Sequence, residues 1–460
     1  MKEVIKNDVV NKTGNNVLHS RNGKALLVDD VDKNLPPIRA GIEIIPITNQ
    51  EEEFFYFHDP EEYMEKPFVL NKEIAALLPL FNGNYSIRDI VTELKQYGSE
   101  VEESHILSFM HQLDEARLLL SPRFKQHKKE VDEKFEKAGV RPAICAGHSY
   151  PAEKGKLEKL LKKAFSESDR SGNPSIENKP VNKENAKRGE GARKRIKALF
   201  APHIDLRVGL PSYISAFRSL AGIKPSRVII LATSHYSGMY HPTYEGKPFI
   251  VTRKEFKTPL GTVQADQDAL NLLESNALNT GCTFQDRAHR VEHSIELHLI
   301  FLQHLWSHPF RIVPILVGSL EEMYYVKHGE IGNKVMAMAS LLENYFGTDD
   351  QTLFLISGDL AHFGKKFGDQ HTAASLFEKV KIFDHTFLEC AKTGDRERML
   401  EIIKKEEDPY RICGFPPLYT ALTALPGIAG KVTGYEFWDE HERESAVTFG
   451  SVLYHQDINE

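Results

Sequence analysis

The chain has 460 residues, a formal net charge of -7 and 27% charged residues, an ordinary globular composition with enough material for two or three domains. The negative balance disfavours a general role in binding nucleic acid or a membrane surface. No apolar stretch approaches the roughly 20 residues of a membrane span, and the polar N-terminus lacks the apolar core of a signal peptide. Four widely spaced cysteines do not form a disulfide framework. We therefore expect a cytoplasmic protein with reduced thiols.

The first part of the chain begins with a polar segment, residues 1–29, that predicts a flexible arm. Two strand-like segments, 41–48 and 53–58, are joined by Asn49-Gln50 and predict a short β-ribbon. Three short amphipathic helices follow, in which apolar residues recur at i, i+3, i+4 and i+7. This combination predicts a small winged-helix (α+β) domain over residues 30–122.

The boundaries of these helices carry their own signals. Asn71 is a plausible N-cap for the first helix, and Ser86 with Asp89 resembles a capping box at the start of the second. The third helix covers residues 103–117 and precedes a strand-like segment, 118–120. Each apolar stripe is typical of a helix face that packs into a core.

Several motifs of this region together resemble a PqqD-like domain, a peptide-recognition module that serves radical-enzyme modification systems. The resemblance implies that the domain binds a peptide, by addition of a strand to the β-ribbon. A winged helix can also bind DNA, but four acidic residues against one arginine at the third helix would repel phosphates. A docking module that only clamps the second domain is the remaining alternative. The matching motifs are residues 37–43, 58–60, 80–90 and 113–116.

Residues 123–141 are charged and predict a helical linker, and residues 142–460 form the second domain. Within it, residues 166–195 are almost entirely polar. Such a segment buries too little apolar surface to offset the entropy of ordering it, so we expect a disordered insert.

The second domain alternates apolar strands with helical patterns. Residues 197–203 and 227–235 are apolar runs that flank a helix-like stretch, 213–220. Strand, helix and strand at this spacing predict a βαβ unit whose two parallel strands lie side by side. The same rhythm continues, so we expect an α/β domain with a mainly parallel central sheet. Further strands are expected at residues 311–317, 353–359 and 446–454, and further helices at 336–346, 373–391, 396–405 and 417–424.

Three of the predicted strands end on groups that can bind metals or move protons. His203 and His235 end the first two, and Asp359 with His362 follows the strand at 353–359. Ligand sites in open α/β sheets form outside the carboxyl ends of the strands. The two imidazoles could share one metal there, while Asp359 orients His362 as a base. A histidine at a strand end can also merely satisfy a loop carbonyl.

Two other segments carry candidate functional groups. Cys413 lies in a turn punctuated by Gly and Pro that opens a helix, where a thiol has a lowered pKa and is a good soft ligand. A lone cysteine can equally be a small buried apolar group. Residues 289–298 form the densest polar cluster, and a helix there would turn Glu292, His293 and Glu296 into a polar pocket. Some of these side chains could instead pair with one another.

Together these segments resemble the Memo-like family, specifically the protein B branch of the AmmeMemoRadiSam system. The resemblance implies a fold like that of extradiol dioxygenases, with His203, His235 and Cys413 as ligands of copper or iron; zinc would also suit them. It further implies partners of the radical SAM and AMMECR-like classes. The matching segments are residues 201–203, 233–235, 258–261, 292–298, 313–318, 357–362 and 412–416.

Roles for the surrounding residues follow from that resemblance. We expect His362, Asp359 and His293 to be catalytic, and the pocket to bind substrate through other polar groups. Two positions depart from the family pattern, Asp205 where Gly is frequent and Tyr236 where a second His is frequent. The dioxygenases use a carboxylate as third ligand, so Cys413 argues against ring cleavage. The expected substrate-binding residues are Glu292, Glu296, Asp205 and Tyr236.

Two functional hypotheses remain open from the sequence. The first is a metal-dependent redox enzyme that acts with radical SAM and AMMECR-like partners on a peptide-linked or small substrate. The second is a non-catalytic protein that binds a peptide or partner on a dioxygenase-like fold. Asp359 and His362 favour the enzyme, because peptide binding alone needs no base beside a metal, whereas Cys413 favours the binding protein. A purely structural metal is a third, weaker reading.

Overall fold

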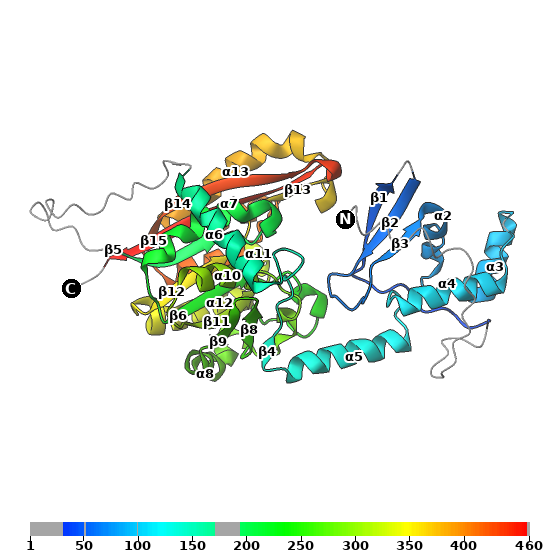
Figure 1. Ribbon diagram of the computed structural model, residues 1–460, viewed down its shortest axis with the longest axis horizontal. Helices are drawn as coiled ribbons and strands as arrows, with labels where there is room; N and C mark the ends of the chain where they lie inside the picture. Colours follow the sequence, from blue (N-terminus) through cyan, green and yellow to red (C-terminus); the bar gives the residue numbers. More distant parts are fainter. Residues whose placement is uncertain (1–30, 50–51, 99, 171–193, 458–460) are drawn as a thin grey trace, which may run out of the picture. The chain divides into compact units, whose positions relative to one another are not determined.

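In the computed structural model the chain divides into two compact units, Met1–Val131 and Asp132–Glu460 (Figure 1). The expected arm, residues 1–29, lies outside the described residues, and so does the stretch 171–193 of the expected insert. Within the described part of the chain, each helix is too short or too polar to span a lipid bilayer. The structure describes residues 31–49, 52–98, 100–170 and 194–457.

The first unit contains a three-stranded antiparallel sheet. The predicted ribbon is present, because β1 (Glu43–Asn49) pairs with β2 (Glu52–His58) in register from Glu43 opposite His58. A third strand, β3 (Phe68–Asn71), pairs with the other edge of β2 and was not predicted. Its four residues are too few to display the alternation that identifies a strand. Residues 118–120 form no strand, and Leu119 makes only an isolated bridge to Ile38.

In the first unit the predicted N-caps are present, but the first predicted helix is shorter than expected. Asn71 caps a single turn, α2 (Lys72–Ala75), and a separate 3₁₀ turn (Leu78–Leu80) replaces the rest of the expected first helix. Pro79 lies in that turn and cannot donate an interior helical hydrogen bond. Ser86 and Asp89 form the predicted capping box. The longer helices are α3 (Ile87–Gln96), α4 (Glu103–Glu115) and α5 (Pro122–Lys137), the last within the predicted linker.

The second unit is built on a large, mostly parallel sheet. Its centre consists of four parallel strands in the order β5 (Lys194–Ala201), β12 (Thr352–Ser357), β6 (Arg227–Thr233) and β11 (Arg311–Val317). The expectation that β5 and β6 lie side by side is therefore wrong. β12 is inserted between them and hydrogen-bonds to both, which brings three strand ends to one stretch of the sheet's carboxyl edge.

Further strands extend the sheet on both sides, antiparallel beside β5, and both parallel and antiparallel beside β11. β15 (Ser445–Asp457) pairs with β5 and also with β14 (Ala429–Glu440) and the short β13 (His362–Gly364). On the other side lies a hairpin of β8 (Glu255–Thr258) and β9 (Gly261–Ala265). The remaining short strands are β4 (Val140–Arg141), β7 (Phe249–Val251) and β10 (Cys282–Thr283).

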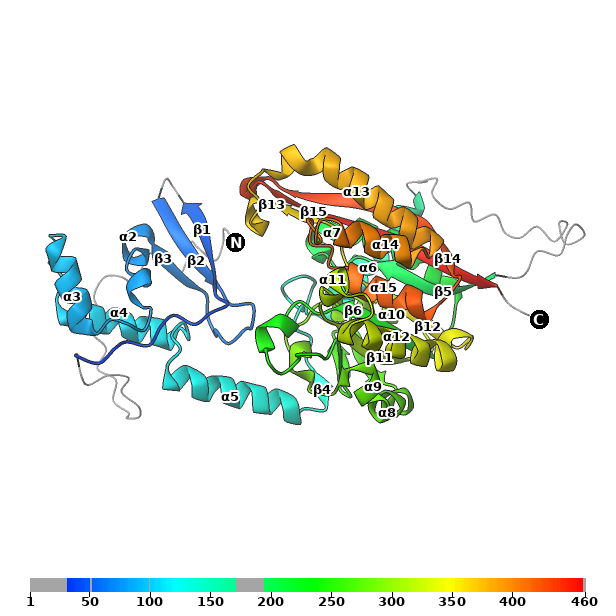
Figure 2. The same ribbon diagram turned by 180° about the vertical axis from the view of Figure 1, so that it is seen from behind.

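Helices cover both faces of this sheet (Figures 1 and 2). Alternate residues of β5 enter different cores: Ala198 and Phe200 belong to one, Leu199 and Ala201 to the other. This three-layer arrangement explains why the central strands are apolar on both faces. One face carries α6 (Lys154–Arg170), α7 (Leu206–Phe217) and α10 (Glu296–Leu305), and the other α12 (Glu330–Leu342), α13 (Ala373–Thr393), α14 (Arg396–Lys404) and α15 (Phe415–Ala424).

Shorter helical segments complete the second unit. The predicted helix over residues 289–298 is wrong: a 3₁₀ turn (Asp286–His289) ends before it, residues 290–295 are irregular, and α10 begins only at Glu296. The other short helices are α8 (Gln267–Ser275), α9 (Ala277–Thr280), α11 (Glu322–Tyr325), a π-helix (Glu343–Gly347) and 3₁₀ turns at Arg218–Gly222, Ser237–Tyr240, Lys365–Phe367 and His441–Arg443.

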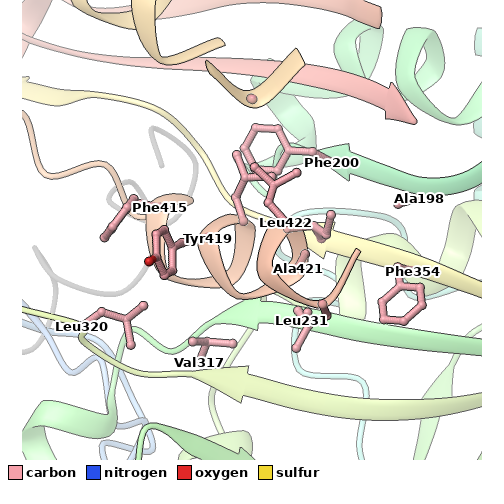
Figure 3. Close-up of a cluster of buried hydrophobic side chains, with 14 of the residues drawn as sticks. Ala198, Phe200, Leu231, Val317, Leu320, Phe354, Phe415, Tyr419, Ala421 and Leu422 are labelled. Atoms are coloured by element: carbon pink, nitrogen blue, oxygen red, sulfur yellow. The ribbon is translucent and has the colours of Figure 1, made fainter. Parts of the chain in front are cut away.

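Helix α15 is fixed against the central strands by one of the two cores of this unit. Figure 3 shows Phe415, Tyr419 and Leu422 of this helix facing apolar side chains of the sheet, among them Phe200 and Leu231. All five side chains are at most 2% exposed. The packing therefore fixes where α15 begins, and Cys413 lies two residues before its first residue.

Candidate metal centre

His203 follows β5 and is only 1% exposed. Its Nδ1 lies 3.0 Å from the hydroxyl oxygen of Ser357, at the end of β12. That hydroxyl donates its own hydrogen to the carbonyl of Ser294 at 2.6 Å, so the Ser357 oxygen accepts from Nδ1–H of His203. The neutral imidazole then carries its lone pair on Nε2. The neighbouring strand thus selects the tautomer that can bind a metal through Nε2.

His235 follows β6 and is oriented by a carboxylate. Its backbone N–H donates to Glu292 Oε2 at 2.7 Å, and its Nδ1 lies 2.9 Å from Glu292 Oε1. Burial lowers the pKa of His235, but the Glu292 and Cys413 side chains outweigh burial and hold that pKa well above its usual value. Burial likewise raises the pKa of Glu292, yet the charge and hydrogen bonds of His235 bring it to about 2. Glu292 therefore leaves Nε2 of His235 available.

Cys413 completes the group from a third segment. Its Sγ lies 3.3 Å from His203 Nε2 and accepts from the backbone N–H of Asp359 at 3.2 Å. A Cβ on Gly358 would lie 2.1 Å from the Cα of Gly414, so this close approach of the two backbones requires glycine. The ligand atoms of His203, His235 and Cys413 all lie within 4.8 Å of one another.

The expected lowering of the Cys413 pKa is wrong for the metal-free protein. Burial raises the pKa of this thiol and outweighs the opposing influence of His235. The first residue of α15 is Phe415, so the thiol precedes the helix and does not lie in its first turn. A bound cation would favour the thiolate, because metal ligands bind in their deprotonated form.

Asp359 and His362 lie beside this group. Asp359 Oδ1 accepts from the backbone N–H groups of His203 at 2.9 Å and Ile204 at 3.2 Å, while burial raises the pKa of Asp359 to about 7. Nδ1 of His362 lies 3.1 Å from the carbonyl oxygens of both Leu360 and Arg411. Backbone carbonyls therefore orient His362, and the expectation that Asp359 does so receives no support from the hydrogen bonds. Burial and the charge of His235 lower the pKa of His362 to about 4.

His293 lies against the imidazoles of both His203 and His235. Its ring centroid is 4.8 Å from that of His235, nearly parallel to it, and 5.2 Å from that of His203. Burial and the charge of His235 lower the pKa of His293 to about 4. The imidazole is therefore neutral near pH 7 and can accept a proton or a hydrogen bond beside the site.

Three of the expected substrate-binding residues have other partners, and the first of them is Glu292, which orients His235 as described above. Glu296 is fully buried against Arg141, so the assignment of Glu296 to a pocket is corrected to a structural ion pair. Asp205 caps α7 by accepting from Arg207 N at 2.8 Å and also pairs with the Arg207 side chain. The ring centroid of Tyr236 lies 6.2 Å from that of His235, so Tyr236 stays beside the group of metal-ligand candidates.

Sequence reasoning missed the hydroxyl groups that hold this site together. Thr233 Oγ1 donates to the carbonyl of Cys413 at 2.7 Å, and Ser294 Oγ donates to the carbonyl of Thr233 at 2.7 Å. Ser357 orients His203 as described above. Thr233 and Ser357 are the last residues of their strands, and that position beside the metal-ligand candidates was the available signal.

The geometry defines an α/β protein in which two histidines and one cysteine meet at the carboxyl edge of a mostly parallel sheet. Two imidazole nitrogens and a thiolate suit copper, zinc or ferrous iron. Comparison with known proteins then places the chain: a family model described as Memo-like protein matches residues 141–453, and the chain belongs to that family.

Several proteins similar to the chain carry Memo names. A MEMO1 family protein of Aquifex aeolicus is 26% identical over 406 residues, which cover 87% of this chain and 96% of the relative. One from Thermus thermophilus is 28% identical over 363 residues, covering 78% and 95%. A Caenorhabditis elegans protein named Protein memo-1 homolog is 27% identical over 233 residues, covering 50% and 61%. The two bacterial matches are longer than residues 132–460, so they extend into the first unit.

Proposed function

We propose that the protein is a metal-dependent redox protein that holds one transition metal through His203 Nε2, His235 Nε2 and Cys413 Sγ. The observation that carries the proposal is the orientation of the two imidazoles. Ser357 and Glu292 each engage Nδ1, so both Nε2 atoms are left for the group that includes Cys413 Sγ, and His235 Nε2 gains its lone pair once the imidazolium releases its proton. Copper or iron fits a redox role with this donor set, and zinc would fit a non-redox role.

The residues around the metal ligands supply proton transfer and positioning. A bound metal with an open coordination position would supply redox chemistry or polarise a substrate oxygen. His362 is neutral near pH 7, and its Nε2 is the ring nitrogen not turned to a carbonyl, so it can take a proton from a substrate held nearby. His293 offers a second neutral imidazole, and Asp359 holds the backbone of His203 in place.

Metal analysis of single variants tests the ligand assignment. The Cys413→Ala protein, purified without oxygen, should lose most of its bound metal while its circular dichroism is unchanged, and His203→Ala and His235→Ala should do the same. Cys390→Ala is the matched control, because Cys390 is a buried cysteine in the core of the same unit. Full metal occupancy in Cys413→Ala would contradict the three-ligand assignment.

The enzyme hypothesis has a non-catalytic alternative on the same pocket. Cys413 occupies the position where dioxygenases use a carboxylate, which favours a protein that binds a peptide or partner without turnover. Oxygen uptake by the metal-loaded protein, with and without the reduced partner proteins, separates the two. Uptake that is lost in His362→Ala supports the enzyme, whereas no uptake together with partner binding supports the alternative.

The proposal includes a place in the AmmeMemoRadiSam system, as its protein B, on a dioxygenase-like fold. It is supported by Memo-like family membership and by metal-ligand candidates that follow parallel strands. The partners would be radical SAM and AMMECR-like proteins. Co-purification of the full-length chain with a radical SAM protein and an AMMECR-like protein tests this part, and failure of both to bind at micromolar concentrations would count against it.

For the first unit we propose a PqqD-like role in peptide binding. β1 pairs with β2 on one side, and among the described strands nothing pairs with its other edge. Ile44 is 44% exposed on this strand, and Pro46 is a residue that sheets tolerate at edges. An extended peptide could add to that edge through its backbone. The acidic residues of α4 disfavour a nucleic-acid partner.

Titration of the full-length protein with peptides encoded beside its gene tests this role. Ile44→Asp should weaken binding at the β1 edge. Leu120→Asp is the matched control, because Leu120 is another exposed apolar residue of the same unit. Salt-sensitive binding to duplex DNA with no response to any peptide would contradict the assignment.

A further inference from the structure

The turn that leads into Cys413 has a backbone conformation that side chains other than glycine rarely adopt. Glu407, Asp408 and Arg411 have φ angles of 55°, 53° and 52°. In this left-handed region the Cβ atom lies too close to the following carbonyl oxygen. Residues in such a conformation persist where the surrounding contacts hold them, and they cluster at functional sites. Arg411 lies two residues before Cys413, so the contacts of Arg411 bear directly on the candidate metal centre.

Hydrogen bonds within the turn fix it to the preceding helix. The backbone N–H of Asp408 donates to Ile403 O, in the last turn of α14, at 2.9 Å. The carbonyl of Asp408 accepts from Arg411 N at 3.1 Å. Both carboxylate oxygens of Asp408 lie 3.0 Å from Ile412 N and accept from it. The turn is therefore attached to α14 at one end and closed by Asp408 at the other.

Three hydrogen bonds join residues 410–411 to His362. The backbone N–H of His362 donates to Tyr410 O at 2.7 Å. Nδ1 of His362 lies 3.1 Å from Arg411 O and carries the hydrogen, because a carbonyl oxygen only accepts. Nε–H of Arg411 donates to His362 O at 2.9 Å. The guanidinium also pairs with Asp369 at 2.6 Å, and Asp369 accepts from Gly364 N at 2.7 Å. Both the backbone and the ring of His362 are thus attached to the turn.

These three hydrogen bonds depend on the positive φ of Arg411. The Tyr410 carbonyl lies before the N–Cα bond of Arg411, whereas the Arg411 carbonyl and side chain lie after it. Rotation about that bond to the usual negative φ would turn the second group relative to the first, so His362 could not keep all three partners. The carbonyl of Leu360 also lies 3.1 Å from Nδ1 of His362. Leu360 is only two residues from His362, so its carbonyl cannot attach the ring to the turn that precedes Cys413.

We propose that Arg411 is a positioning residue of the site, whose left-handed backbone and guanidinium hold the His362 ring beside the Cys413 turn with its hydrogen on Nδ1 and its lone pair on Nε2. The inference rests on the proposed function, in which His362 is the base, because a base needs that lone pair to accept a proton. An ion pair with Asp369 is the simpler role for Arg411, whose side chain is 40% exposed. Exposed ion pairs contribute little, and this one accounts neither for the φ of Arg411 nor for its hydrogen bonds to His362.

Nitrogen NMR of the metal-free, full-length protein, with isotope-labelled histidine rings, tests the inference near pH 7. The ring shifts distinguish the two neutral tautomers, and His362→Gln identifies the signal of His362 by its loss. Wild type should show the Nδ1–H tautomer alone. Arg411→Val lacks the guanidinium and disfavours positive φ, so it should show both tautomers, with roughly tenfold faster exchange of the ring N–H. Arg411→Gly also lacks the guanidinium but adopts positive φ readily, so it should keep mostly the Nδ1–H tautomer.

Arg253→Val is the matched control and should behave as wild type. It removes an ion pair of similar exposure, between Arg253 and Glu274 at 2.8 Å, from a residue with an ordinary backbone conformation. Equal disturbance of His362 in Arg253→Val and Arg411→Val would overturn the inference, because loss of an ion pair would then be the cause. If Arg411→Val does not fold, Arg411→Ala takes its place, since alanine also disfavours positive φ.

The remaining outcomes separate this inference from the proposed function. A single Nδ1–H tautomer with unchanged exchange in Arg411→Val would overturn the inference, since the Leu360 carbonyl would then be sufficient. A mixture in Arg411→Gly as large as in Arg411→Val would overturn the role of the left-handed backbone. The NMR measurement needs neither metal nor turnover. Oxygen uptake that persists in His362→Ala would therefore end the role of His362 as the base, while the positioning of its ring by Arg411 would stand or fall on the tautomers alone.

Discussion

Two buried glutamates that are four residues apart allow the orientation of His235 and an internal ion pair to be perturbed separately. Glu292 accepts from Nδ1 and the backbone N–H of His235, and from Ser294 N. Glu296 accepts from the Arg141 guanidinium, from two backbone N–H groups and from the Tyr150 hydroxyl. Both carboxylates are at most 1% exposed. We predict that Glu292→Gln weakens metal binding, whereas Glu296→Gln weakens the fold.

The expected loss in Glu292→Gln follows from the group that orients His235. A glutamine keeps one acceptor for the backbone N–H, but its amide nitrogen cannot accept from Nδ1–H. The ring is then no longer fixed with its lone pair on Nε2. Loss of such a partner of a histidine ligand typically lowers metal affinity by about 10- to 100-fold, which corresponds to roughly 1.4 to 2.7 kcal/mol.

The expected loss in Glu296→Gln has a different origin. Arg141 and Glu296 are both 0% exposed, and the substitution would leave a buried guanidinium without its counter-ion. Breaking a buried ion pair by removing one partner costs about 3 to 5 kcal/mol of stability. The hydrogen bonds of the Glu292 carboxylate involve neither Arg141 nor Glu296, so the folded fraction should retain the wild-type metal affinity.

Chelator competition measures the affinity and urea unfolding of the metal-free protein measures the stability. Glu292→Gln also loses its ion pair with His235, so both variants unfold more easily, and metal affinity is the quantity that distinguishes them. Equal affinity losses in the two variants, or unchanged affinity in Glu292→Gln, would refute the assignment of Glu292 as the group that orients His235.

Three further predictions concern charge and packing. Asp384 is fully buried and burial raises its pKa to about 7. The folded protein holds the proton of Asp384 more tightly than the unfolded chain does. This preference stabilises the fold at pH 3 and is lost as the pH rises through 7. Asp384→Asn, which does not titrate, should therefore gain on the order of 4 kcal/mol in free energy of unfolding relative to wild type between pH 3 and 8, measured by urea unfolding. Metal affinity should rise with pH because the His235 imidazolium and the Cys413 thiol must release protons; calorimetry in buffers of different ionisation enthalpy measures that release. Gly358→Ala should lose metal because its Cβ would collide with the backbone beside Cys413, whereas Gly155→Ala, with nothing within 4 Å, should not.

The central strands could be predicted from the sequence because each is buried on both faces. β5, β6, β11 and β12 read as continuous apolar runs, and the structure places strands at all four. Their order could not be predicted in the same way. Nothing local in the apolar run of β12 indicates that it pairs between β5 and β6, since pairing partners are chosen by long-range packing. The short strands, such as β13, carry too few residues for a periodic signal.

The metal-ligand candidates could be predicted, but the roles of their neighbours could not. His203 and His235 follow predicted strands, and the structure groups them with Cys413. Glu292 and Glu296 were expected on one helix face and therefore in one pocket. The chain is irregular from residue 290 to 295, so the two carboxylates instead take different partners. Helical periodicity was the wrong guide there because tertiary hydrogen bonds to Glu292 replace those of a helix.

The strand that the sequence did not place is the one that organises the site. Ser357, at the end of β12, orients His203, which is 154 residues away in the chain. Asp359, two residues further, accepts from the backbone of His203 and donates its own N–H to Cys413 Sγ. The carbonyl of Asp359 also accepts from Gly414 N. If β12 did not lie between β5 and β6, these hydrogen bonds could not all form. The geometry of the proposed metal ligands therefore depends on the order of the strands as well as on the ligand residues.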